Sequence, residues 1–306
     1  MVQPLPRPVR DVLAKRVYRM HLYLFDEIRD HWPNYAEDAK DKIRELGWEP
    51  PHPAVDENAV EIPTNGAGED YLYLHCELLS FINYLLAQNG DPAFPRVEGW
   101  VRLPGPDDPE YPVPPSFYLP QGLAVSNAFI PRAKSDDFFE RRMRYWERQC
   151  ATPMYLRGVT LSEFGTMIEG TLHDSVRSRW AAVPGAWRPD PPTPEELVPD
   201  WWDDPNYDYL RDPYSMHVNP IFWKFFGWVQ DRIEDWKLAN AVFGRNFWEN
   251  TWIGKIPGER QPSGSCPAGP REVPLFAVFD ESDLGAQHLA EMEQVVAAIA
   301  ESEAAG

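Results

Sequence analysis

The chain has 306 residues, and its 48 acidic and 29 basic side chains give a formal net charge of −19. Hydrophobic residues make up 43% of the chain and aromatic residues 13%, which is enough for a large core. Binding to a nucleic acid or to an anionic membrane needs clustered Lys and Arg, so this acidic balance argues against both partners.

The cysteines and the hydropathy pattern predict a cytoplasmic protein. Cys76, Cys150 and Cys266 are too few for a disulfide framework, and their odd number fits a reducing compartment. The first residues lack the apolar run of a signal peptide. The chain also contains no apolar run long enough to span a bilayer.

Apolar residues at three- and four-residue spacing predict helices along most of the chain. The expected helices cover residues 9–32, 34–46, 71–88, 135–150, 160–180, 219–236 and 282–302. Thr160 and Glu163 form a capping box that marks the start of the fifth helix. Two segments rich in Gly, Pro and Asp, residues 89–131 and 183–218, predict long ordered loops.

This order of elements predicts a mainly α fold, with a four-helix-bundle core and long irregular loops. We expect a helical domain over residues 1–255, a linker over 256–281 and an acidic C-terminal helix over 282–306. The aromatic segment 187–204 is a candidate lid, or else structural packing around the bundle.

Two of the seven histidines, His75 and His173, lie in the middle of apolar helical stripes. Taken alone, such a histidine is more often a hydrogen-bonded core residue than a metal ligand. His31 and His288 are expected at the surface. His217 is expected to cap the start of the next helix or to face solvent, with a position in a pocket as the alternative.

Three segments resemble the copper-binding regions of tyrosinases and haemocyanins, the type 3 copper superfamily. The stretch "IEGTLHDSVR", followed after a loop by "NPIFWKFFGWVQDRIEDW", is similar to the second copper region. The stretch "YLHCELLSFINYLL" is similar to the end of the first region, and the three segments occur in the family's order. The resemblance covers residues 71–236 and implies a tyrosinase-like helical bundle.

Most of the copper ligands that the resemblance implies are replaced in this chain. His75 matches a ligand of the first copper and His173 matches the first ligand of the second copper. The other ligand positions of the second copper carry Arg177, Phe225 and Phe226. A guanidinium repels a cation and a phenyl ring cannot ligate, so the second site should hold no copper.

We therefore predict no cofactor. A single metal ion on His75 and His173 stays open as an alternative, with His21, His52 or Cys76 as a further ligand. Imidazole suits copper and related ions, but the spacing of these residues does not require a metal.

The helices of such a bundle would still enclose a pocket for a small-molecule substrate. The candidate catalytic residues are His75, His173, Asp174 and Arg177. The candidate substrate-binding residues are Phe225, Phe226, Glu169 and His217. We expect His75 and His173 to face each other across this pocket. A buried Arg177 needs a partner, for which Asp174, Glu77 or a carboxylate of the substrate are the candidates.

Imidazole beside carboxylate and guanidinium suits acid–base chemistry, because burial and neighbouring charges move pKa values towards neutrality. The resemblance thus implies a copper-independent enzyme of natural-product biosynthesis, acting on a small aromatic or amino-acid-derived molecule. One alternative is a metal-dependent phenol oxidase or monooxygenase with a rearranged site. The other is a non-catalytic binding protein, in which these groups form a satisfied salt-bridge network.

Overall fold

The computed structural model describes residues 2–120, 124–192, 201–244, 247–248, 251–259, 266, 273–280 and 282–305. Within these ranges the chain is mainly α-helical and has no strand beyond an isolated bridge between Val55 and Glu61. None of the helices described has the length and hydropathy needed to cross a membrane.

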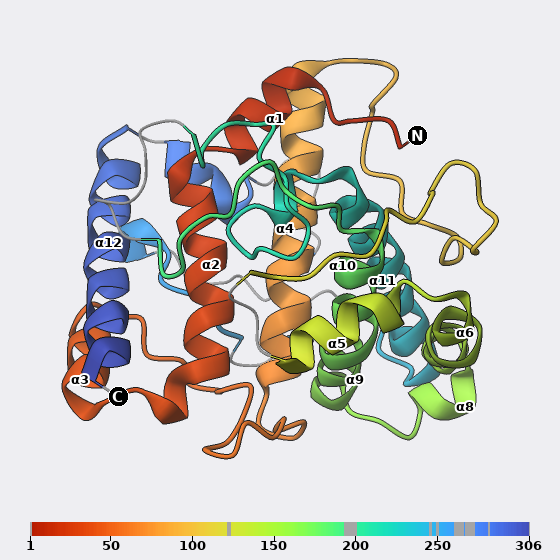
Figure 1. The fold of residues 1–306 in the computed structure, drawn as a ribbon, viewed down its shortest axis with the longest axis horizontal. Helices are drawn as coiled ribbons and strands as arrows, with labels where there is room; N and C mark the ends of the chain where they lie inside the picture. Colours follow the sequence, from red (N-terminus) through yellow and green to blue (C-terminus); the bar gives the residue numbers. More distant parts are fainter. Residues whose placement is uncertain are drawn as a thin grey trace.

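The helices of the core surround α4, which runs through the middle of the molecule (Figure 1). The α-helices are α1 (Arg7–Leu13), α2 (Arg16–His31), α3 (Glu37–Glu45), α4 (Ala67–Asn89), α5 (Ala124–Ala133), α6 (Asp136–Phe138), α7 (Arg144–Cys150), α8 (Pro153–Leu156), α9 (Leu161–Met167), α10 (Asp174–Trp180), α11 (Pro220–Ala239) and α12 (Ser282–Ala305). The shorter helical turns are η1 (Trp32–Asn34), η2 (Phe139–Met143), η3 (Ile168–His173), η4 (Met216–Val218), η5 (Pro257–Glu259) and η6 (Leu275–Asp280).

Two of the helices expected from the sequence contain a π-helical turn. The turn η2 joins α6 to α7, and η3 joins α9 to α10 without a break in the chain's helical course. The capping box of Thr160 and Glu163 starts α9, as predicted. π turns often occur at functional sites, and His173 lies at the end of η3.

The helix expected over residues 9–32 is two helices, α1 and α2, separated at Ala14 and Lys15. The fully buried guanidinium of Arg19 donates a hydrogen bond of 2.8 Å to the carbonyl oxygen of Ala14. That carbonyl is therefore satisfied outside the regular helical ladder, and the chain can turn between the two helices.

Close backbone contact between α4 and α9 fixes the centre of the bundle. A Cβ atom added to Gly165 would lie 1.9 Å from the carbonyl oxygen of Gly68, and one added to Gly68 would lie 2.0 Å from the carbonyl oxygen of Ser162. The lack of a side chain on both glycines therefore lets the two helices touch. Their contact sets how α4 faces the continuous helix α9–η3–α10.

The long loop after α4 is ordered by its contact with α11. The backbone N–H of Trp100 donates to the carbonyl oxygen of Lys224, and a Cβ added to Gly99 would lie 2.2 Å from the backbone of Gly227. The expected loop over residues 89–131 was wrong at its end, because α5 begins at Ala124. In α5 only Ile130 and Ala133 are buried, so this helix shows a weak apolar pattern in the sequence.

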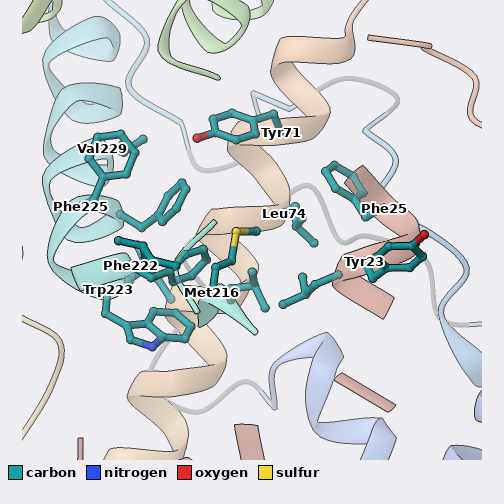
Figure 2. Close-up of a cluster of buried hydrophobic side chains, with 14 of the residues drawn as sticks. Tyr23, Phe25, Tyr71, Leu74, Met216, Phe222, Trp223, Phe225 and Val229 are labelled. Carbon is teal, nitrogen blue, oxygen red and sulfur yellow. The ribbon is translucent and has the colours of Figure 1, made fainter. Parts of the chain in front are cut away.

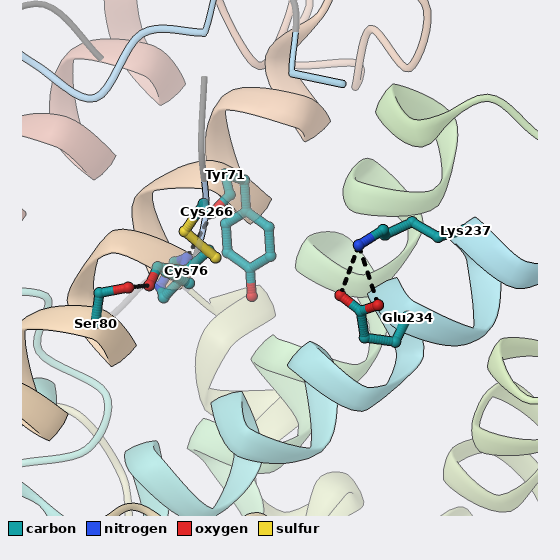
Figure 3. Close-up of a disulfide and its surroundings, with 7 residues drawn as sticks. Tyr71, Cys76, Ser80, Glu234, Lys237 and Cys266 are labelled. Carbon is teal, nitrogen blue, oxygen red and sulfur yellow. Dashed lines mark hydrogen bonds and ion pairs between the residues drawn. A yellow bond between two sulfur atoms is a disulfide. The ribbon is translucent and has the colours of Figure 1, made fainter. Parts of the chain in front are cut away.

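Cys76 and Cys266 form a disulfide with a Cα–Cα distance of 6.0 Å (Figure 3), so the expectation that these cysteines are reduced was wrong. Disulfides persist in oxidising compartments, which removes the cysteine argument for a cytoplasmic location. Cys150 is buried and free. The bond was not evident from the sequence because its two cysteines are 190 positions apart.

The segment expected as a linker, residues 256–281, is partly outside the described residues, and its described parts belong to the core. In η6, Phe276 and Phe279 are buried, and η6 packs against α4 and α12. Helix α12 in turn packs along α2 and α3 (Figure 1). Residues 193–200 of the predicted lid over 187–204 also lie outside the described residues.

Candidate functional site

His75 of α4 and His173 of η3 lie close together, as predicted, with their ring centroids 5.9 Å apart, but they meet in the core and not across a pocket. Both imidazoles are buried. The ring of Phe226 stacks on His75 at 3.7 Å and 5° between the planes, and the ring of Phe225 lies parallel to that of His173 at 6.0 Å. Figure 2 shows the surrounding apolar cluster, with Phe222 and Phe225 of α11 and Tyr71 and Leu74 of α4 among its side chains.

The two histidines are held in neutral form. The Nδ1 atom of His75 lies 2.7 Å from the carbonyl oxygen of Tyr71, which can only accept, so Nδ1 carries the proton. Burial lowers the pKa of His75 to about 3. Burial, with Arg177 and His75 nearby, holds the pKa of His173 well below its ordinary value.

Three polar atoms at this centre have no hydrogen-bond partner among the residues that the structure describes. They are the Nε2 atoms of His75 and His173 and the hydroxyl of Tyr71. The Tyr71 ring lies 4.4 Å from His75 and 5.5 Å from His173 between centroids. Unpartnered buried polar groups are costly, so they point to a requirement other than packing.

A pocket of about 330 Å³ lies beside His173, between α2 and the helix α9–η3–α10. Four predicted site residues line it, namely Glu169, His173, Asp174 and Arg177. The other four do not line it, since His75, Phe225, Phe226 and His217 are each at most 2% exposed within the core. The predicted substrate-binding role of the two phenylalanines is therefore replaced by their packing on the imidazoles.

Arg177 is paired, but with none of the predicted partners. Its Nη1 lies 3.6 Å from Oδ2 of Asp26 on α2, and its Nη2 donates a hydrogen bond of 2.9 Å to the carbonyl oxygen of Arg211. The side chain thus crosses to the neighbouring helix, while Asp174 is exposed at the pocket edge. This geometry leaves Arg177 poorly placed to take a carboxylate of a substrate.

A second arginine fixes Glu169 at the pocket wall. The guanidinium of Arg29 is fully buried and donates to both carboxylate oxygens of Glu169, at 2.8 and 3.1 Å, and to the carbonyl oxygen of Ala67. Such a bidentate contact holds the carboxylate in one orientation.

The sequence analysis missed Asp26, which has the most suitable pKa for acid–base chemistry. Removal from solvent by the surrounding protein raises the pKa of Asp26 to about 7. Arg177 and Arg29 lower this pKa, and the neighbouring charges of Glu169 and Asp174 partly offset their effect. A carboxyl group with this pKa can give and take a proton near neutral pH. Its one sequence signal is its place one turn before Arg29 and Asp30 on α2.

The remaining histidines lie apart from this pocket or at its rim. His217 neither caps a helix by its side chain nor faces solvent, since its buried Nε2 lies 2.8 Å from the carbonyl oxygen of Leu13. His288, expected at the surface, is buried and lies 3.3 Å from His21 between ring nitrogens. His31 is exposed, as predicted, and pairs with Glu27.

The residues around His75 and His173 do not fit a metal site. His52 is bound to Asp70 at 2.9 Å, His21 lies 2.7 Å from the carbonyl oxygen of Ile253, and Cys76 is in the disulfide. Across the described part of the chain, no group of three or more His, Cys, Asp or Glu side chains is placed to hold a metal ion. We therefore propose no reaction step that uses a metal at His75 and His173.

A scan against protein-family models finds no match to this chain, and a search of curated proteins finds none either.

Proposed function

We propose that residues 1–255 form a divergent tyrosinase-like helical domain that acts without copper. The three segments that resemble the copper regions are α4, the helix α9–η3–α10 and α11, and in the structure they pack against one another. Phe226 stacks on His75 where a family member would carry copper ligands. This packing supports the idea that an apolar plug replaced the metals in an inherited bundle.

We further propose that the protein is an acid–base enzyme for a small aromatic or amino-acid-derived molecule. The observation that carries this proposal is the half-buried carboxyl of Asp26, which has a pKa of about 7 and lines the same pocket as His173. Asp26 would exchange the proton with the substrate. Arg177, 3.6 Å away, would stabilise its ionised form, and neutral His173 would orient a polar group of the substrate.

A non-catalytic binding protein is the second candidate, because the ion pairs of Arg29 with Glu169 and of Arg177 with Asp26 also tie α2 to the helix α9–η3–α10 and can serve a structural role alone. Both candidates use the same pocket. Turnover separates them, and turnover without oxygen or copper separates the first from a metal-dependent oxidase.

The test is an assay of purified protein with phenols and amino-acid-derived amines, under argon and with a copper chelator, followed by mass spectrometry. We expect product formation, and we expect Asp26→Asn to lower kcat by roughly a hundredfold or more, as general acid–base groups do. The matched control is Asp283→Asn, an exposed carboxylate of α12 outside the pocket, which should retain activity. Equal activity of Asp26→Asn, or activity that needs oxygen and copper, would contradict the proposal.

A further inference from the structure

The pocket beside His173 is lined by more carboxyl groups than cationic side chains. Five carboxylates line it, from Asp26, Asp30, Glu61, Glu169 and Asp174. Two are paired, since Asp26 faces Arg177 and Glu169 binds Arg29. The other three, Asp30, Glu61 and Asp174, make no direct ion pair with any residue that the structure describes.

The three unpaired carboxylates come from three separate segments. Asp30 lies in the last turn of α2, and Asp174 is the first residue of α10. Both line the pocket. Glu61 is held over the π turn, because its Oε1 would lie 1.9 Å from a Cβ added to Gly170. Burial raises the pKa of Glu61, and the nearby charges of Glu169 and Asp174 raise it further. Glu61 and Asp174 repel each other, so a cation placed beside both would be stabilised.

Two buried polar side chains give an independent indication of a ligand. The Nε2 atom of His173 and the hydroxyl oxygen of Thr166 have no hydrogen-bond partner in the described protein, and both residues line the pocket. They are only 3% and 7% exposed. Each of these atoms can form a hydrogen bond with a polar group of a ligand.

The rest of the lining favours a small organic molecule over a bare ion. Ala54, Val55, Ala59 and Ala67 give the pocket an apolar wall. Its volume of about 330 Å³ is at the small end of the range for sites that bind small molecules. An anionic ligand is disfavoured because the terminal nitrogens of Arg177 are directed at Asp26 and at the carbonyl oxygen of Arg211.

We propose that this pocket binds a small organic amine that also carries a hydroxyl group, with the ammonium beside Glu61 and Asp174 and the hydroxyl at His173 or Thr166. This inference rests on the proposed function, since it names the substrate class of the same pocket. It also replaces the earlier expectation of an anionic substrate held by Arg177.

The test is isothermal titration with four probes of similar shape. Tyramine has the ammonium and the hydroxyl, phenethylamine only the ammonium, tyrosol only hydroxyls, and 3-(4-hydroxyphenyl)propionate a carboxylate instead of the ammonium. We expect tyramine to bind roughly tenfold or more tightly than tyrosol, as a charged hydrogen bond allows, and the propionate to bind most weakly. Equal affinity for tyramine and tyrosol, or tighter binding of the propionate, would overturn the inference.

Single substitutions test which side chains contact the ammonium and which contact the hydroxyl. Glu61→Gln and Asp174→Asn replace exposed side chains, so the fold should survive, and each should weaken tyramine severalfold while leaving tyrosol unchanged. Thr166→Val should reduce the preference for tyramine over phenethylamine. Asp283→Asn, outside the pocket, should change neither affinity. A uniform loss for all four probes in Glu61→Gln and Asp174→Asn would show a structural effect and count against the ammonium site.

The two proposals fail separately. Binding of tyramine with the expected selectivity but no turnover of any compound would keep the amine site and refute the enzyme. Turnover of neutral or anionic phenols, with no preference for amines, would keep the enzyme and refute the amine site.

Discussion

At the scale of single residues, burial decides the chemistry of the pocket more than residue type does. Asp26 and Asp174 are both aspartates on pocket-lining helices, yet Asp174 is exposed, whereas Asp26 is half-buried beside Arg177 and has a pKa raised to about 7. His75 and His173, the residues that the sequence pattern singled out, are neutral because burial lowers their pKa values. The group that titrates near neutrality is therefore a carboxyl that the pattern did not identify.

The raised pKa of Asp26 predicts a pH dependence of stability. The folded state keeps this proton up to about pH 7 and the unfolded state loses it near the ordinary value, so Asp26 destabilises the fold as pH rises from about 4 to 7. Three units correspond to at most about 4 kcal/mol. Thermal unfolding of Asp26→Asn should thus show a flatter pH profile and a higher Tm than the wild type at pH 8.

Asp30 needs a separate control, because removal from solvent raises its pKa as well, to about 8. Asp30→Asn should therefore also flatten the profile, over the range from about pH 4 to about pH 8. An unchanged profile in Asp26→Asn would mean that its carboxyl ionises normally in the folded protein, and the acid–base role would lose its support.

At the scale of elements, the contact of α4 with α9 places His75 opposite His173. Gly165→Ala would put a methyl group 1.9 Å from the carbonyl oxygen of Gly68, which is backbone and cannot move aside cheaply. We expect a loss of about 1–3 kcal/mol or more in the free energy of unfolding, measured with urea. Gly185→Ala is the control, because a Cβ there meets no atom within 4 Å. Equal stability of the two variants would show that the helices can separate without cost.

At the scale of the whole molecule, the disulfide of Cys76 with Cys266 ties α4 to a residue that precedes η6 and α12 in the sequence (Figure 3). Removing such a link gives the unfolded chain more freedom, so Cys266→Ser or a reducing agent should destabilise the protein by about 2–4 kcal/mol. Thermal unfolding with and without reductant measures this. Cys150→Ala, which leaves the bond intact, should retain the response to reductant. Three alkylatable thiols in the denatured, unreduced protein would contradict the bond.

The sequence by itself determined the mainly helical class, most helix positions, the capping box at Thr160 and the approach of His75 to His173. These depend on local spacing or on the resemblance of whole segments, and both are readable along the chain. Tertiary structure alone decided the pairing of Arg177 with Asp26, the pKa of that carboxyl, the burial of His288 and the disulfide. Each of these depends on which distant segments meet and how much water they exclude, and neither quantity has a local signal in the sequence.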